Sequence, residues 1–235
     1  MVVYALVLAG GVGLRFSAQS STQEYSKLDK TIPKQLQLQG NCSVLERTVN
    51  AFEMCKLIDH IVVVMNEKWI KDTIHYLGKI SNSKILDIIK GGVTRAKSSI
   101  LGVEYIKEHA KTNAKVLIHD AVRPHIKQDQ IARTIQALDE SDAVLPTIPV
   151  VQSIIELGDN GSFAYCERDK YQLAQTPQGF KLDVISAAYS LFEQAHDNFE
   201  PTDDISVLMR YSPTARISTI EGSPTNKKIT YPSDL

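Results

Sequence analysis

Residues 2–16, VVYALVLAGGVGLRF, begin as a run of apolar residues and then break into closely spaced glycines. Within this stretch, Tyr4–Leu8 has the length and the apolar composition of a buried strand. A glycine-rich turn directly after such a strand lets backbone N–H groups approach an anionic group closely, most often a phosphate. The stretch therefore predicts an α/β fold whose first strand leads into a phosphate-binding loop.

Four further runs in the chain are short, rich in Val and Ile, and show little alternation of polar and apolar residues. This pattern is typical of buried parallel strands that are covered on both faces of a sheet. The predicted strands are His60–Met65, Ile85–Ile89, Lys115–Ile118 and Ala143–Pro146.

Between these strands, apolar residues recur at the spacing of a helix with one buried face. They are Leu45, Val49 and Phe52 in one segment and Ile131, Ile135 and Leu138 in another. Alternating strands and helices predict a three-layer α/β/α, doubly wound, mostly parallel sheet of the Rossmann-like type. Because the carboxyl ends of parallel strands meet at one edge, we expect the glycines, Gly91-Gly92 and His119-Asp120 to lie together.

Length, charge and cysteine content narrow the class of protein. The chain has 235 residues, 43% of them hydrophobic, and a net charge of −1, which gives no electrostatic case for a nucleic-acid or membrane partner. Cys42, Cys55 and Cys166 are odd in number and lack metal-ligand spacing, which favours reduced thiols. The apolar run Val2–Ala9 is too short to span a bilayer. We therefore expect a cytoplasmic protein.

Two segments depart from the alternating pattern. Residues 16–32 are polar and form a loop long enough to suggest a functional role. Residues 147–175 contain two extended runs around GDNGS, which predicts a protruding β-hairpin arm. The apolar positions of this arm need a partner surface, either the body of the protein or another subunit. Although the length also fits two small domains, we expect one domain over residues 1–235 that includes this arm.

The glycine loop fits neither of the two commonest nucleotide loops. A dinucleotide fingerprint needs Gly or Ala where Phe16 stands, and it needs an acidic residue about 20 positions further on, which is lacking. The G-x-x-x-x-G-K-[ST] phosphate loop is also absent. A Gly-Gly-x-Gly pattern alone is equally compatible with a tight turn, so its interpretation depends on the residues around it.

Positively charged residues and four further stretches support phosphate binding. Arg15 and Lys34 could neutralise a triphosphate, and Asp120 has the carboxylate that Mg²⁺ prefers. Taken singly, Asp120 could cap a helix, Arg123 could form a surface ion pair, and the lysines near residue 228 could be solvated. The four stretches are GGVTRAKSS (91–99), HDAVRP (119–124), QTPQGF (175–180) and TNKKITYPSDL (225–235).

In this order, these motifs resemble the cytidylyltransferases that act on small polyol phosphates. That group includes the methylerythritol phosphate and ribitol 5-phosphate cytidylyltransferases, and the resemblance extends from Ala5 to Leu235. It implies a nucleotidyltransferase that transfers CMP from CTP to a polyol phosphate and releases pyrophosphate, with Mg²⁺ or another divalent cation. Because one anionic phosphate must attack another, such catalysis depends on positioning and charge neutralisation.

The resemblance also implies roles for individual residues. Arg15, Lys34 and Lys228 would be catalytic, and Asp120 would hold the metal ion. His119 would be structural, because a phosphate monoester attacks already deprotonated. The nucleotide-binding residues would be Leu8, Ala9, Gly10, Gly11, Gly13, Gly91, Gly92, Arg95, Ser98, Asp120 and Ala121.

The acceptor site and the assembly follow from the same resemblance. In the family the hairpin arm reaches over a neighbouring subunit, which implies a homodimer here, with Arg168 contacting the acceptor phosphate across the interface. Asp203 follows Thr202 in the T-D motif. The acceptor-binding residues would be Asp120, Arg123, Arg168, Thr176, Thr202 and Lys228.

The identity of the acceptor stays open between two branches of the family. Val122 in HDAVRP and Gln152-Ser153 after the fifth predicted strand depart from the methylerythritol branch, whereas TDDIS and EGSPTNKKIT resemble it. We expect a ribitol 5-phosphate-type acceptor, with 2-C-methyl-D-erythritol 4-phosphate as the alternative. Another sugar-phosphate nucleotidyltransferase and a non-catalytic nucleotide-binding module are further alternatives.

Overall fold

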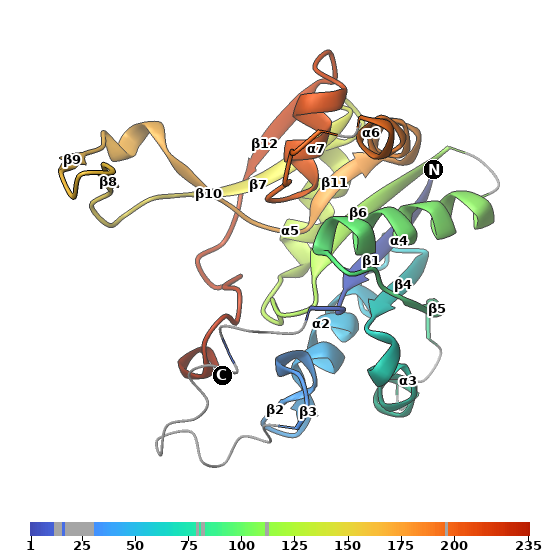
Figure 1. Ribbon diagram of the computed structural model, residues 1–235. Helices are drawn as coiled ribbons and strands as arrows, with labels where there is room; N and C mark the ends of the chain where they lie inside the picture. Colours follow the sequence, from blue (N-terminus) through green and yellow to red (C-terminus); the bar gives the residue numbers. More distant parts are fainter. Residues whose placement is uncertain (12–15, 17–30, 79, 81–82, 111–112, 196) are drawn as a thin grey trace.

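The computed structural model describes residues 1–11, 16, 31–78, 80, 83–110, 113–195 and 197–235 (Figure 1). Most of the polar loop at 16–32 lies outside the described residues, as do Gly13 and Arg15. The description of the fold and of the site is therefore built on the remaining residues.

An eight-stranded sheet forms the centre of the molecule, in the order β10-β7-β11-β6-β1-β4-β5, with β12 also paired to β7 (Figure 1). Strands β6, β1, β4 and β5 are parallel to one another. The strands are β1 Val2–Leu8, β4 His60–Met65, β5 Ile85–Lys90, β6 Ala114–Asp120, β7 Ala143–Pro149, β10 Gln172–Ala174, β11 Gln178–Lys181 and β12 Ile217–Glu221.

Side chains of β1 alternate between two hydrophobic cores, one on each face of the sheet. Val3, Ala5 and Val7 belong to the first core, and Tyr4 and Leu6 belong to the second. Helices α2 (Val44–Glu53), α3 (Ile70–Leu77) and α5 (Gln128–Ala137) contribute to the first core. Helices α4 (Arg95–His109), α6 (Leu182–Gln194) and α7 (Asp204–Tyr211) contribute to the second. The predicted three-layer α/β/α architecture is confirmed.

The sheet departs from the prediction at two places. β11 runs antiparallel between β6 and β7, so the sheet is mixed on that side. The prediction that Ile85–Ile89 is a buried strand is wrong about burial, because in the described part of the chain β5 pairs only with β4, and Leu86 is 41% exposed. A short apolar run looks alike in a central and an edge strand, since the number of neighbours depends on distant parts of the chain.

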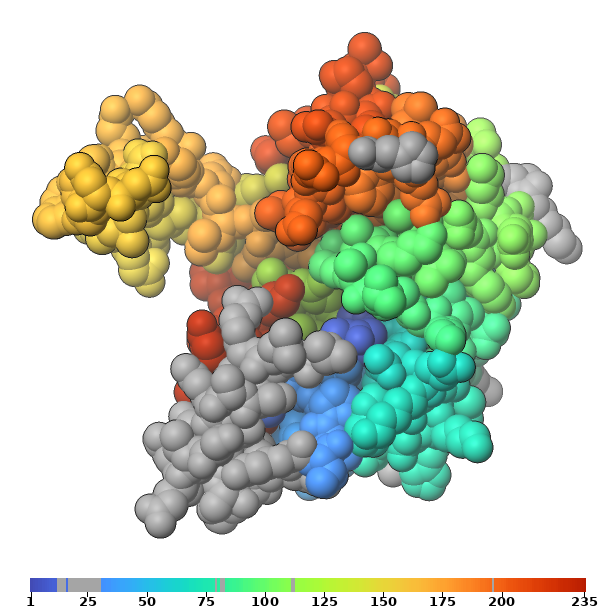
Figure 2. All heavy atoms as spheres, in the orientation of Figure 1, coloured from blue at the N-terminus to red at the C-terminus, as the bar shows by residue number. Residues whose placement is uncertain are grey.

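The predicted hairpin arm is present and projects from the body (Figures 1 and 2). β8 (Ile155–Leu157) and β9 (Phe163–Tyr165) pair antiparallel, and Gly161 adopts a φ of 80° in the turn between them. The base of the arm belongs to the main sheet, because β10 pairs with β7. The rest of the described chain leaves Leu157, Phe163 and Tyr165 64–75% exposed.

The segment after β12 returns across the molecule to residues near Lys34. Ile229 N–H donates to the carbonyl of Val122 at 2.8 Å, and Lys34 Nζ donates to the carbonyl of Ile229 at 2.8 Å. The Gln39 amide donates to the carbonyl of Leu235. The segment therefore lies beside the carboxyl end of the sheet.

Short elements complete the described part of the chain. They are the strands β2 (Leu38–Gln39) and β3 (Cys42–Ser43) and the 3-10 helices η2 (Lys34–Leu36), η3 (Glu67–Trp69), η4 (Arg168–Lys170) and η5 (Pro232–Asp234). Within the described ranges, every helix is too short or too polar to cross a membrane.

Candidate active site

A cavity of about 530 Å³ opens at the carboxyl ends of β1, β4 and β6. Parallel α/β sheets commonly bind ligands at this edge. Its walls are formed by Leu8, Ala9, Gly10, Gly11, Phe16, Lys34, Gln35, Asn66, Gly92, Val93, Thr94, Arg95, Ser98, Asp120, Val122 and Lys228. Of the glycines and strand ends that we expected to meet, the structure places Gly10, Gly11, Gly92 and Asp120 around this cavity.

The first glycine segment is held in place by a buried glutamine. Gln35 follows Lys34 in η2, and its side-chain amide donates to the carbonyls of both Ala9 and Gly11. Ala9 N–H in turn donates to the carbonyl of Val64 at the end of β4, at 2.7 Å. These bonds fix the backbone from Ala9 to Gly11 against the sheet.

The second glycine segment is held by the first turn of α4. Ser98 Oγ accepts a hydrogen bond from Gly92 N–H at 3.1 Å and donates to the carbonyl of Thr94 at 3.0 Å. A Cβ atom on Gly92 would lie 2.4 Å from Cγ of Lys97, so this turn has no room for a side chain. Gly91 lies behind the cavity wall, where its N–H donates to the carbonyl of Met65.

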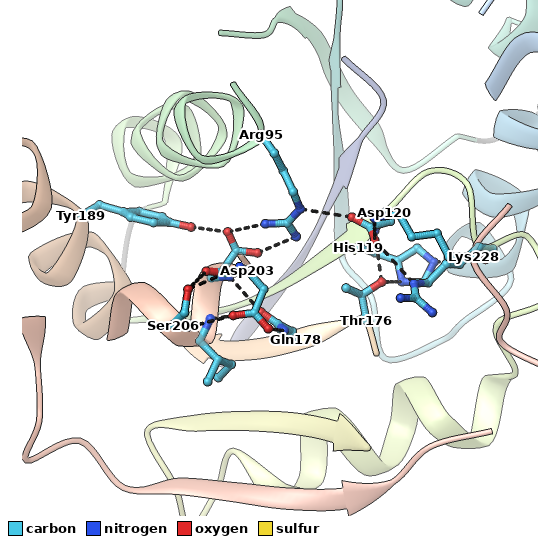
Figure 3. Close-up of polar contacts among 12 residues, drawn as sticks. Arg95, His119, Asp120, Thr176, Gln178, Tyr189, Asp203, Ser206 and Lys228 are labelled. Atoms are coloured by element: carbon cyan, nitrogen blue, oxygen red, sulfur yellow. Dashed lines mark hydrogen bonds and ion pairs between the residues drawn. The ribbon is translucent and has the colours of Figure 1, made fainter. Parts of the chain in front are cut away.

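Asp120, the last residue of β6, is surrounded by three positive charges. Its Oδ1 lies 3.3 Å from Nε of Arg95, and its Oδ2 lies 2.9 Å from Nζ of Lys228 and 3.5 Å from Nε of Arg123 (Figure 3). Burial alone would raise the pKa of Asp120, but Arg95, Lys228 and Arg123 together lower it far below its usual range. Asp120 is therefore a carboxylate at any ordinary pH.

Arg95, the first residue of α4, joins Asp120 to a second buried carboxylate. Its two terminal nitrogens pair with Asp204, Nη1 with Oδ1 at 3.1 Å and Nη2 with Oδ2 at 2.9 Å. Burial would lower the pKa of Arg95, but the two carboxylates outweigh this effect and raise it. The guanidinium is thus a fixed positive charge on the cavity wall.

Arg123, Thr176 and His119 form a layer behind Asp120. Thr176 Oγ1 accepts a hydrogen bond from Asp120 N–H at 3.1 Å and lies 3.0 Å from Nδ1 of His119. His119 Nε2 lies 3.2 Å from the carbonyl of Arg123, whose Nη1 donates to the carbonyl of Asn226 at 2.9 Å. Because the carbonyl of Arg123 can only accept, Nε2 of the neutral imidazole carries the proton, and Nδ1 accepts the hydroxyl proton of Thr176. This layer orients Asp120 without lining the cavity.

The protein should lose stability as the pH falls from about 6.5 to about 4 because of His119. Burial lowers the pKa of His119 from 6.5 to about 4, so in this range the unfolded chain binds a proton that the folded chain does not. At about 1.4 kcal/mol per pKa unit, the loss is on the order of 3 kcal/mol. Urea unfolding across this range should show a shallower loss for His119→Gln than for the wild type. His125→Gln, which removes an exposed histidine nearby, serves as the control variant. Equal slopes for His119→Gln and the wild type would contradict the prediction.

The cavity gathers many, but not all, of the residues singled out in the sequence. Ala121 is buried behind the wall, Thr202 is exposed ahead of α7, and Arg168 lies on the arm with Nη1 bonded to the carbonyl of Val151. Gly13 and Arg15 lie outside the described residues. The predicted residues that line the cavity are Leu8, Ala9, Gly10, Gly11, Lys34, Gly92, Arg95, Ser98, Asp120 and Lys228.

Sequence reasoning missed several polar residues that build the site. Gln35 directly follows Lys34, and Asn226 stands two residues before Lys228, yet neither was assigned a role. Asn226 is fully buried, and its side-chain amide donates to the carbonyl of Thr176 at 2.7 Å. Asp204 was also missed, although it directly follows Asp203. The positions of these three residues beside predicted site residues could have marked them as part of the site. Their individual roles follow only from their tertiary contacts.

The donor set around Asp120 can be compared with the needs of a magnesium ion. No cluster of three His, Cys, Asp or Glu side chains suited to a metal occurs in the described ranges. Mg²⁺ in nucleotide sites often takes only one or two carboxylates and completes its shell with water and substrate phosphates. Asp120 fits this use, because its carboxylate is ionised and lies on the wall of the cavity.

Known proteins resemble this chain over nearly its whole length. The family described as "IspD: 2-C-methyl-D-erythritol 4-phosphate cytidylyltransferase" matches residues 3–235. The 2-C-methyl-D-erythritol 4-phosphate cytidylyltransferase of Thermobifida fusca is 32% identical over 99% of this chain and 90% of that protein. The bifunctional ribulose 5-phosphate reductase/CDP-ribitol pyrophosphorylase Bcs1 of Haemophilus influenzae is 32% identical over 98% of this chain. The match covers 46% of that protein, so the chain spans less than half of its length.

Solved structures agree with the sequence relatives. The 4-diphosphocytidyl-2C-methyl-D-erythritol synthase of Anaerococcus prevotii superposes with a TM-score of 0.79 at 25% identity, covering 99% of this chain and 94% of that one. The 2-C-methyl-D-erythritol 4-phosphate cytidylyltransferase of Francisella tularensis has the same fold, with a TM-score of 0.78 at 24% identity over 100% of this chain and 96% of that one. The chain therefore belongs to the IspD family, whose members are CTP-dependent cytidylyltransferases.

Proposed function

We propose that the chain transfers CMP from CTP to a small polyol phosphate of the ribitol 5-phosphate type, giving a CDP-polyol and pyrophosphate. The observation that carries the transfer is the convergence of Lys34, Arg95, Asp120 and Lys228, from four separate parts of the chain, on one cavity of about 530 Å³. Three of these side chains are positive, which suits a cavity that must hold a triphosphate and an acceptor phosphate together.

The proposed reaction is an in-line displacement at the α-phosphorus of CTP. An oxygen of the acceptor phosphate forms a bond to this phosphorus while the bond to the bridging oxygen of the β-phosphate breaks, and pyrophosphate leaves with that electron pair. Lys34 and Lys228 would neutralise the charge that develops on the α-phosphate and on pyrophosphate. Arg15, outside the described residues, is proposed to act with them. Since the attacking phosphate is already ionised, no protein base is required.

The two glycine segments are proposed to bind the nucleotide. The backbones of Ala9 to Gly11 and of Gly92, with Ser98, would hold cytosine by hydrogen bonds, which a purine would leave unpaired. Asp120 would hold Mg²⁺, which when bound would neutralise part of the negative charge of the phosphates. Behind it, Arg123 and Thr176 keep the carboxylate oriented toward the cavity.

The choice of acceptor has two candidates with different support. The ribitol type is supported by the relation to the bifunctional Haemophilus influenzae protein and by Val122, which lines the cavity. The alternative, 2-C-methyl-D-erythritol 4-phosphate, is supported by the matching family and by the relative from Thermobifida fusca. Either acceptor presents the same reacting group, a phosphate monoester on a short polyol.

Pyrophosphate release tests this proposal directly. The purified protein would be assayed with CTP, UTP, ATP and GTP against a panel of tetritol, pentitol and hexitol phosphates, with Mg²⁺ present. We expect release with CTP and a pentitol phosphate, and preference for methylerythritol phosphate would instead establish the second candidate. Preference for another nucleotide would indicate a different sugar-phosphate nucleotidyltransferase. Binding of CTP without turnover on any acceptor would indicate a nucleotide-binding module.

The arm is proposed to complete the acceptor site of a second copy of the chain in a homodimer. Its exposed apolar side chains, among them Phe163 and Tyr165, would be covered by that copy. Arg168→Ala should then raise the KM for the acceptor at least tenfold, which corresponds to the loss of about 1.4 kcal/mol from one charge-assisted hydrogen bond. The same variant should bind CTP and dimerise as the wild type does. Lys170→Ala, in the same 3-10 helix, serves as the matched control. Unchanged acceptor kinetics in Arg168→Ala would remove the residue from the site.

A further inference from the structure

We propose that Asp204 is a positioning residue for the transfer reaction, because it holds Arg95 by its terminal nitrogens and thereby keeps Arg95 from capturing the carboxylate of Asp120. The inference rests on the proposed role of Asp120 toward a divalent cation. It assigns a purpose to a buried ion pair that sequence reasoning missed.

The geometry divides the donors of Arg95 unequally between its two carboxylates. Asp204 receives both terminal nitrogens, at 3.1 and 2.9 Å, in a two-pronged contact. Asp120 receives only Nε, at 3.3 Å (Figure 3). Two parallel bonds from a guanidinium to one carboxylate form the strongest arrangement that these groups can adopt. Asp204 therefore holds the stronger half of the contact, and Asp120 holds the weaker half.

Asp204 is itself anchored from two other elements. Tyr189 of α6 donates its hydroxyl proton to Oδ1 of Asp204 at 2.7 Å. Gln178 of β11 accepts hydrogen bonds from the backbone N–H groups of Asp204 and Ile205, each at 3.1 Å. The side chain of Asp204 is 1% exposed, so water does not compete for these contacts. A carboxylate fixed in this way can hold Arg95 in one orientation.

The charges around Asp120 explain why this orientation matters. Arg95, Arg123 and Lys228 place three positive charges near Asp120, and Asp204 contributes the second negative charge. Without the negative charge of Asp204, the terminal nitrogens of Arg95 would be free to turn to Asp120. Asp120 would then be paired more tightly, and a divalent cation would have to displace a stronger partner. Asp204 thus keeps Asp120 available for the metal ion.

The test compares the affinity for a divalent cation in variants of Asp204. Asp204→Asn keeps the shape of the side chain and removes its charge. We expect this variant to bind Mn²⁺ about tenfold more weakly in the presence of CTP. This is the lower end of the loss in metal affinity found when a residue that supports a metal ligand is replaced. Binding would be followed by electron paramagnetic resonance of free Mn²⁺ without acceptor, and the Mg²⁺ concentration for half-maximal turnover should rise in parallel. Tyr189→Phe should shift both in the same direction by about threefold, the worth of one hydrogen bond.

Asp197 offers a closely matched control. It lies near α7, pairs with Arg210 and accepts a hydrogen bond from the Tyr211 hydroxyl, as Asp204 does with Arg95 and Tyr189. Unlike Arg95, however, its partner Arg210 is not one of the described residues that line the cavity. Asp197→Asn should leave the Mn²⁺ affinity unchanged. Asp204→Glu, which restores the charge, should recover most of the affinity that Asp204→Asn loses.

Each outcome either supports or overturns the inference. Wild-type Mn²⁺ affinity in a folded Asp204→Asn protein would overturn it, as would equal losses in the Asn and Glu variants. Should Asp204→Asn not fold, Tyr189→Phe decides, and unchanged Mn²⁺ binding there would also overturn it. Pyrophosphate release by the wild type reports on the proposed function separately, because the binding measurement needs no acceptor and no turnover.

Discussion

Lys228→Met is expected to lower kcat by about 10²- to 10³-fold, the range found when one stabilising donor to a developing negative charge is removed. Nζ of Lys228 lies 2.9 Å from Oδ2 of Asp120 and faces the cavity, where it can move from the carboxylate to an incoming phosphate. Methionine keeps the unbranched stem and removes only the charge. Asp120 keeps Arg95 and Arg123 as partners, so the fold should remain intact. Steady-state kinetics with saturating CTP and acceptor would measure the effect.

Lys227→Met is the matched control for this prediction. Lys227 is the preceding residue, its side chain is 70% exposed, and it pairs with Asp234 instead of facing the cavity. We expect turnover within about twofold of the wild type for this variant, as for most surface substitutions away from special features. A similar loss in both variants would mean that the segment as a whole, and not the charge of Lys228, supports the reaction.

Asp120→Asn is expected to separate nucleotide binding from turnover. The neutral amide is a much weaker ligand for Mg²⁺ than a carboxylate, so kcat/KM should fall by at least about 10³-fold, as when a preorganised charge in a reaction centre is lost. Binding of CTP without metal should persist or tighten, because Arg95, Arg123 and Lys228 lose the negative charge with which they were paired. Calorimetric titration with CTP in the presence of a chelator would measure this second effect.

The same substitution should also lower the free energy of unfolding. Removing one partner of a buried ionic cluster typically costs about 3–5 kcal/mol, and the Asp120 side chain is 9% exposed. Asp129→Asn, which alters an exposed ion pair with Arg133 on α5, provides the control for both measurements. Wild-type turnover in Asp120→Asn would exclude Asp120 as a metal ligand and as the centre of the site.

Local patterns were sufficient to predict the parts of the fold that depend on neighbouring residues. The strands at Tyr4–Leu8 and His60–Met65 were predicted well, because a buried parallel strand needs an apolar run and a following turn. The antiparallel insertion of β11 between β6 and β7 was not predicted. Nothing in the four residues QGFK indicates which strands they will join, since that depends on segments more than 30 residues away.

In the candidate site, too, some residues could be predicted from their local position in the sequence, whereas others depend on distant contacts. Residues at strand ends and in glycine turns, such as Gly10 and Asp120, were predicted because their positions along the chain imply the carboxyl edge of the sheet. Asp204 could not be assigned from the sequence, because its partner Arg95 lies 109 residues earlier. The role of Gln35 could not be predicted either. Its side-chain amide donates to two backbone carbonyls, and every residue has such a carbonyl, so the sequence does not indicate which ones it contacts.

The separation of the hairpin arm from the cavity has a consequence for how such a chain can change. No lining residue of the cavity, among those the structure describes, comes from the segment between β7 and β11. Side chains of the arm can therefore be substituted, or replaced by those of a relative, without changing any described residue of the cavity wall. In the proposed homodimer, preference for a new acceptor could then evolve through the arm without a change in the residues that line this cavity.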